Sequence, residues 1–157
     1  MKITLLTVGK TEDKYLKEGI EKYTRRLKHY ISFQIIELPE LKNTKHLSAE
    51  QQKAKEAELL LKNIQPTDSL ILLDENGTEF SSLQFSQFLN KKMLGSVQHL
   101  VFAVGGPYGF DVSIYNRAND KISLSRMTFS HQMVRLFFTE QLYRAFTILK
   151  GEPYHHE

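Results

Sequence analysis

HLVFAVGGPYG, at residues 99–109, is the stretch that decides the fold class. Its first six residues, His99–Val104, are almost wholly apolar, which is typical of a strand buried on both faces of a parallel sheet. The glycine-rich segment that follows ends this strand. In open α/β sheets ligands bind beyond the carboxyl ends of the strands, and adjacent glycines let a ligand approach bare backbone. The alternative is that residues 105–109 form only a turn.

The rest of the chain alternates strand and helix patterns around this stretch. Further apolar runs predict strands at Ile3–Val8, Phe33–Leu38, Leu70–Leu73 and Ile122–Leu124, with a turn at residues 74–77. Between them, apolar periodicity and capping signals predict helices over residues 11–30, 48–63, 82–93, 111–119 and 132–150. This order predicts an α/β fold with a mostly parallel sheet and helices on both faces. No linker or repeat divides residues 1–157, so we expect a single domain.

Composition excludes several classes of protein. With 41% hydrophobic and 25% charged residues, the 157-residue chain is neither disordered nor of low complexity. The absence of cysteine excludes disulfide frameworks, thiolate metal sites and a cysteine nucleophile. No stretch approaches the ~20 apolar residues of a membrane span, and the first apolar run is too short for an export signal. We therefore expect a cytoplasmic protein without membrane contact.

Positive charge is concentrated in two segments. The net charge is +3, yet residues 14–29 and residues 117–150 each carry an excess of four positive charges. Two such zones on an otherwise acidic chain favour a polyanionic partner such as nucleic acid. The alternative is that these side chains only keep helices soluble.

Three segments follow the ends of predicted strands and are candidates for a ligand site. They are the segment after Leu73, residues 105–109 and residues 123–129. The glycines of the second do not match the dinucleotide fingerprint, and no phosphate-binding GxxxxGK[ST] motif is present. The third combines Leu124, Met127 and Phe129 with hydroxyl residues, which suits a pocket for a flat heteroaromatic ligand. The alternative is that these apolar residues belong to the core.

The last helix and the tail carry candidate catalytic groups. Glu140 and Arg144 are four residues apart, which makes them either a surface ion pair or part of a site. Frayed termini seldom contain bulky aromatic and titratable residues, yet Tyr154 and His155 lie at the end of this chain. His155 can take a proton near neutral pH. With no third ligand beside His155 and His156, we expect no metal site.

Five motifs in order resemble one family over the whole chain. They are MKITLLTVGK at residues 1–10, GGPYG at 105–109, LSRMTFSHQMVR at 124–135, EQLYRA at 140–145 and PYH at 153–155. The family is the ribosomal large-subunit methyltransferase H family of the SPOUT class. The resemblance implies an α/β fold with a C-terminal trefoil knot, a homodimer, and transfer of a methyl group from S-adenosylmethionine to N3 of a pseudouridine in helix 69 of 23S rRNA.

The resemblance also implies roles for individual residues. The cofactor is expected to contact Leu73, Gly105, Leu124, Ser125, Arg126, Met127, Thr128 and Phe129. His155 is the candidate base, with Glu140 as the alternative, while Arg135 and Arg144 are expected to hold RNA phosphate or charge developing on the base. Tyr154 is expected to stack on a base. The sequence departs from the family at Tyr108 and Phe110, and we expect no loss of function from this.

Several points stay open at this level. The wide apolar face of residues 132–150 also favours a homodimer, but the tail could serve its own pocket or that of the partner subunit. The substrate could be free 23S rRNA, or 23S rRNA within the large subunit or within the complete ribosome. A non-catalytic RNA-binding module and a dinucleotide-binding oxidoreductase are the rival functions. Cofactor binding distinguishes all three.

Overall fold

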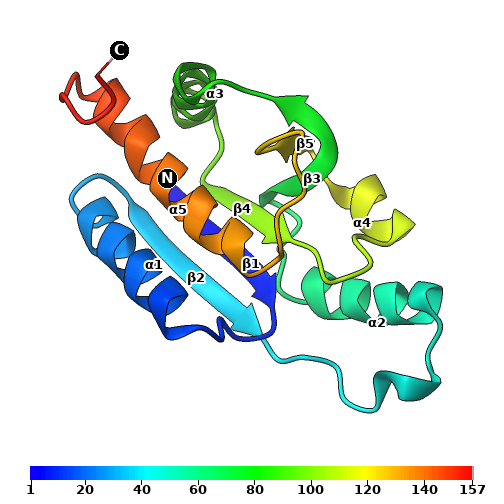
Figure 1. Ribbon diagram of the computed structural model, residues 1–157. Helices are drawn as coiled ribbons and strands as arrows, with labels where there is room; N and C mark the ends of the chain where they lie inside the picture. Colours follow the sequence, from blue (N-terminus) through cyan, green and yellow to red (C-terminus); the bar gives the residue numbers. More distant parts are fainter. Residues whose placement is uncertain (157) are drawn as a thin grey trace.

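The computed structural model describes residues 1–156, and its centre is a five-stranded parallel sheet (Figure 1). The strand order is β2-β1-β4-β3-β5. The strands are β1 (Lys2–Val8), β2 (Ser32–Leu38), β3 (Ser69–Glu79), β4 (His99–Val104) and β5 (Asp120–Ser123). Every pairing between these strands is parallel. The predicted α/β fold with a parallel sheet is confirmed.

Helices cover both faces of the sheet, as predicted. Along β4, Leu100 and Phe102 pack with α1 (Lys14–Leu27), α3 (Ser82–Leu94) and α5 (Met133–Leu149). The alternate residues Val101 and Ala103 pack on the other face with α2 (Ala49–Leu61) and α4 (Val112–Arg117). This alternation follows from the period of two along a strand and explains why the strands are apolar on both sides. A short 3₁₀ helix, Thr44–His46, precedes α2.

Several predicted boundaries are wrong, and for two of them the contacts give the cause. The strand expected to end at Leu73 continues to Glu79, because after a register shift Thr78 and Glu79 pair again with β5. The predicted turn residues lie at this irregularity, where the Asn76 N–H donates to Asp74 Oδ1 at 3.0 Å. The helix expected from Thr11 begins at Lys14, because the Thr11 N–H and hydroxyl both donate to Glu37 at 2.6 and 2.7 Å.

The capping box predicted at the start of α2 is confirmed. The Ser48 side chain accepts from the Gln51 N–H at 3.1 Å, and the Gln51 side chain accepts from the Ser48 N–H at 2.9 Å. Among the described residues, no helix is long and apolar enough to cross a membrane. The trefoil knot stays a prediction.

Candidate functional site

A cavity of about 630 Å³ lies at the carboxyl ends of the central strands. Its walls come from the irregular part of β3 at residues 73–76 and from the segments at the ends of β4 and β5, and its remaining side comes from the start of α5. The three segments that the sequence singled out therefore meet in one place. Their contributions are Leu73 to Asn76, Val104 to Phe110, Ser123 to Ser125 and Met127 to His131, joined by Tyr115 and Val134.

The segment after β4 presents backbone to this cavity. Gly109 has a φ of 83°, a left-handed conformation that favours glycine, and its N–H donates to Gly106 O at 3.1 Å. A Cβ on Gly106 would lie 2.6 Å from Glu56 Oε2, so the buried Glu56 side chain occupies the space behind this glycine. The glycines thus fix a tight turn and leave room for a carboxyl group against it.

The ionisable residues that line the cavity are mainly acidic. Asp74 and Glu75 contribute carboxylates, while the 21 lining residues, all within the described chain, contain His131 but no lysine or arginine. The Tyr115 hydroxyl donates to Asp74 Oδ2, which joins α4 to β3 across the cavity. Burial, followed by this hydrogen bond, raises the pKa of Tyr115 to about 12, so the phenol stays protonated. The cavity therefore suits a ligand that carries positive charge.

A smaller cavity of about 320 Å³ shares the segment after β5 with the first. Aromatic side chains dominate its walls, and the rings of Phe129 and Phe137 lie 4.7 Å apart. Phe137 is 38% exposed and Met127 is 75% exposed. Apolar surface of this kind, next to a cavity, is typical of an interaction site.

The tail returns to α5 and forms a second polar cluster. Glu140 Oε1 accepts from Arg144 Nη2 at 2.6 Å and from the Tyr154 hydroxyl at 2.8 Å. The Arg144 guanidinium lies 4.7 Å from the centre of the Tyr154 ring, and its Nη1 lies 3.2 Å from His155 Nδ1. The structure thus brings together four of the five residues expected to act in catalysis.

Contacts in this cluster fix the protonation of two members. The hydrogen bond to Glu140 raises the pKa of Arg144 above its already high value, so the guanidinium stays cationic. Burial, followed by hydrogen bonds with Tyr23 and Glu140, raises the pKa of Tyr154 well above its ordinary value. Tyr154 is therefore a phenol that donates its proton, and it is unavailable as a base at neutral pH.

The cluster and the cavity lie at opposite ends of the sheet. The cavity is at the carboxyl ends of the strands, whereas the Tyr30 hydroxyl, just before β2 begins, donates to Glu152 at 2.6 Å. Figure 1 shows α5 running back along the sheet, so that the C-terminus lies far from the end of β4. No residue of the 140–156 segment lines the cavity of its own chain.

Comparisons with known proteins identify the family of this chain. Residues 1–155 match the family model described as "Predicted SPOUT methyltransferase". The chain belongs to the SPOUT methyltransferase family. It is 59% identical over 157 residues to "Ribosomal RNA large subunit methyltransferase H" of Parabacteroides distasonis, with 100% of both chains covered. It is 58% identical over 156 residues to the protein of the same name from Christiangramia forsetii, with 99% of both chains covered.

Most residues that the SPOUT resemblance assigned to the cofactor line the cavity. These are Leu73, Gly105, Leu124, Ser125, Met127, Thr128 and Phe129. Arg126 does not line it. Its side chain is 88% exposed, and its Nε donates to Glu79 Oε1 at 3.1 Å, which turns the guanidinium toward the edge of β3.

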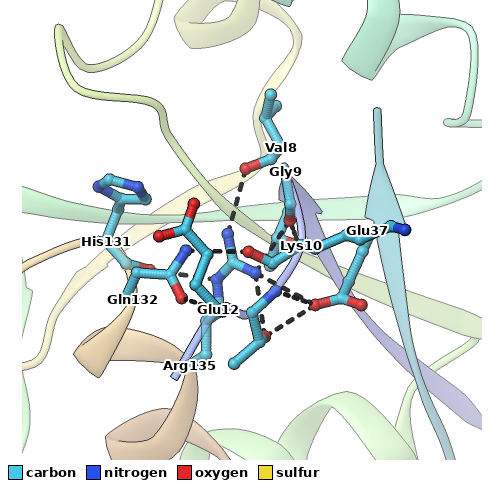
Figure 2. A network of polar contacts seen from close by, with 10 residues as sticks. Val8, Gly9, Lys10, Glu12, Glu37, His131, Gln132 and Arg135 are labelled. Atoms are coloured by element: carbon cyan, nitrogen blue, oxygen red, sulfur yellow. Dashed lines mark hydrogen bonds and ion pairs between the residues drawn. The ribbon is translucent and has the colours of Figure 1, made fainter. Parts of the chain in front are cut away.

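Arg135 does not belong to the tail cluster, and Figure 2 shows its guanidinium among Val8, Gly9 and Glu37. It is 1% exposed, and its guanidinium donates to Val8 O at 3.1 Å, Gly9 O at 2.9 Å and Glu37 Oε2 at 3.2 Å. A guanidinium with all these partners inside the protein does not face an RNA phosphate. Its position instead ties the start of α5 to the carboxyl ends of β1 and β2.

Three residues at the cavity were not anticipated from the sequence: Glu56, Asp74 and Tyr115. Asp74 stood in a predicted turn, and its position at a strand end was the available signal. Glu56 and Tyr115 lie on helices with no motif that separates them from surface residues. Among the described residues, no group of three or more His, Cys, Asp or Glu side chains could hold a metal ion.

Proposed function

We propose that this chain transfers a methyl group from S-adenosylmethionine to N3 of a pseudouridine in helix 69 of 23S rRNA. The observation that carries the proposal is that one cavity gathers seven of the eight residues expected to contact the cofactor. Family membership and the names of two full-length relatives support it.

The cavity fits this cofactor in size, polarity and charge. Its volume of about 630 Å³ falls within the range of small-molecule sites. Leu73, Leu124 and Phe129 offer apolar surface to an adenine ring, and the turn at residues 105–109 offers backbone groups to its edges. Asp74 and Glu75 suit a cation. When bound, the cofactor supplies an electrophilic methyl group attached to a positively charged sulfur.

The acceptor must lose a proton, and the tail cluster offers groups that act on it. N3 of a pseudouridine carries an imide proton, and its lone pair is available for attack on the methyl carbon only after that proton leaves. Loss of the proton spreads negative charge onto the neighbouring carbonyl oxygens. We assign the cationic Arg144 to stabilise this charge and the phenol of Tyr154 to stack on or hydrogen-bond the base.

His155 is our candidate for the proton acceptor, but its contact with Arg144 limits when it can accept a proton. Arginine cannot accept a hydrogen bond, so the Nδ1 atom that faces Arg144 at 3.2 Å is the acceptor in that contact. The neutral ring then carries its own proton on Nε2. His155 can therefore take the imide proton only when Nδ1 leaves Arg144 or the ring changes tautomer. Glu140 is a weaker candidate, because its Oε1 already accepts two hydrogen bonds.

A homodimer brings the two parts of the site together. The tail cluster is at the amino end of its own sheet, so we propose that it completes the cavity of the partner subunit. Most of the apolar face of α5 packs inside its own chain, between α1 and α3. We assign two exposed residues to the dimer contact, Phe137 in the wall of the smaller cavity and Met127 in the wall of the larger one.

The structure favours α1 as the surface that meets RNA. Five basic side chains of the first positive segment are exposed: Lys14, Lys17, Lys22, Arg25 and Lys28. In the second segment, two arginines are used within the protein. Arg135 is buried, and Arg117 donates to the carbonyl oxygens of Gln65 and Asp68 at 2.9 and 2.8 Å.

Titration calorimetry followed by methyl-transfer assays tests the proposed function. We expect heat with S-adenosylmethionine and with its demethylated product, and none with NAD. Absence of heat with the first two would end the proposal, and heat with NAD would revive the oxidoreductase reading. RNA binding that is indifferent to the cofactor would favour a non-catalytic module. Labelled methyl transfer to free 23S rRNA, large subunits and complete ribosomes then identifies the substrate.

A further inference from the structure

Glu56 on α2 is a buried acidic residue that the proposed chemistry does not use. It is 6% exposed, and its Oε1 has no hydrogen-bond partner among the described residues. Its carboxyl group lies directly behind Gly106, where a Cβ would come within 2.6 and 2.7 Å of the two carboxyl oxygens. Since Gly106 lines the larger cavity, only one residue of backbone separates this carboxyl group from the ligand space.

Among the described residues, no positive charge is a cause of the pKa shift of Glu56. The causes that shift its pKa are burial, which dominates and raises it, a hydrogen bond with Gln52, which lowers it, and the charge of Glu40, which raises it. All three come from the protein itself, and none is a positive charge. Burying a carboxyl group without a cation beside it lowers the stability of the fold, so we expect this residue to contribute to function.

We infer that Glu56 is a specificity-determining residue, which favours the cationic sulfonium form of the cofactor over its neutral thioether product. This inference rests on the proposed function. Methyl transfer removes one positive charge from the cofactor, and shape changes by a single methyl group. A pocket can distinguish two such ligands strongly by charge and only weakly by shape. Asp74 and Glu75 add negative charge at the rim. Burial favours the neutral acid of Glu56, but a cation bound in the cavity favours its ionised form, and because the side chain is buried the field of that charge is least screened by water.

Calorimetric dissociation constants for the two ligands test the inference. Glu56→Gln removes the charge and keeps the shape of the side chain. We expect it to weaken binding of S-adenosylmethionine by roughly tenfold, the effect of one partly screened charge at short range, and to leave binding of the thioether product within about twofold. Glu58→Gln is the matched control, because it makes the same change on an exposed position of α2. It should change neither constant.

Each other outcome is informative. Equal weakening of both ligands by Glu56→Gln would show that Glu56 does not act on the charge that distinguishes them and would overturn the inference, as would no change in either. Glu56→Asp keeps the charge and should retain the preference. If Glu56→Gln does not fold, calorimetry on the wild-type protein tests the inference instead. The ligand is then an analogue of S-adenosylmethionine in which a protonated amine stands in place of the sulfonium methyl group. Equal affinity for this amine and the thioether overturns the inference. Failure of the wild-type protein to bind any of these ligands refutes the proposed function instead.

Discussion

Tyr30 donates a hydrogen bond to Glu152 at 2.6 Å, and this contact ties the C-terminal tail to the amino end of the sheet. The separation of tail and cavity within one chain follows from this contact, because Tyr30 precedes β2 while the cavity lies at the carboxyl ends of the central strands. The proposed dimer gives the tail a role in chemistry by bringing it to the cavity of a second subunit.

Tyr30→Phe should loosen the tail in a pH-dependent way. The hydrogen bond to Glu152 is the largest cause that raises the pKa of Tyr30 to about 12. A raised pKa means that the contact stabilises the fold fully below the unfolded value of about 10 and is lost as pH rises toward 12. At pH 8 the variant should lose about 0.5–1 kcal/mol in urea unfolding. The difference between variant and wild type should shrink at pH 11, and a constant difference would contradict this reading.

Replacement of Arg135 should destabilise the protein before it affects chemistry. Arg135→Lys keeps the charge but cannot reach Val8 O, Gly9 O and Glu37 together, since lysine lacks the fork of five N–H donors. We expect a loss of about 3 kcal/mol in urea unfolding. Arg25→Ala, which removes an exposed guanidinium from α1, should change stability by less than about 0.5 kcal/mol. A stable Arg135→Lys protein with weakened RNA binding would restore a phosphate-binding role.

Much of the fold could be predicted from the sequence because the strands are buried on both faces. The run at residues 99–104 has no polar interruption after His99, and its two faces do meet two separate layers of helices. The end of β3 could not be predicted, because Thr78 and Glu79 extend the strand through pairing with β5, a contact distant in sequence. Local turn residues at 74–77 therefore gave the wrong boundary.

The loops that line the cavity could be predicted because strand-end loops with glycine or mixed apolar and hydroxyl residues are unusual. The phosphate-binding role expected for Arg135 was wrong. A sequence records that Arg135 and Arg144 share a helix but not which way each faces. Arg135 is buried against backbone carbonyls, and Arg144 meets the tail. The burial of Glu56 could not be predicted for the same reason, because nothing in the sequence around it distinguishes it from the other glutamates of α2.

His155→Ala should separate catalysis from binding. The residue lies beside Arg144 in the tail cluster and outside the cavity of its own chain, so affinity for S-adenosylmethionine and dimerisation should stay nearly intact. The methylation rate should fall by roughly 10²–10⁴, the usual contribution of a positioned general base. His156→Ala is the matched control, because His156 is exposed and its backbone turns to a φ of 61°. Wild-type rates for His155→Ala across pH 6 to 9 would refute the assignment.

Glu56→Gln should stabilise the fold at neutral pH. Burial raises the pKa of Glu56 above its value in the unfolded chain. The sign follows from linkage: the neutral acid is favoured in the fold, so stability is highest below the unfolded pKa of about 4.3 and falls as pH rises through the folded one. The variant, which stays neutral at every pH, should be more stable than the wild type at pH 7 and differ little from it at pH 4. Thermal unfolding at both values checks this, and a destabilised variant at pH 7 would mean that the charged form has a partner.

Mixed dimers should reveal which subunit each tail serves. His155→Ala leaves the cavity intact, and Thr128→Arg places bulk and positive charge in the lining of the cavity while leaving the tail intact. Each variant alone should be nearly inactive. If the tail completes the partner's cavity, a mixed dimer contains one intact pairing, namely the tail of the Thr128→Arg subunit with the cavity of the His155→Ala subunit.

An equal mixture that exchanges subunits freely makes about half of its dimers mixed and should recover roughly a quarter of the wild-type rate. If each tail served its own cavity, no dimer would contain an intact pairing, and the mixture would stay inactive. Sedimentation of the same samples confirms that dimers are present, so an inactive mixture of intact dimers would refute the shared site.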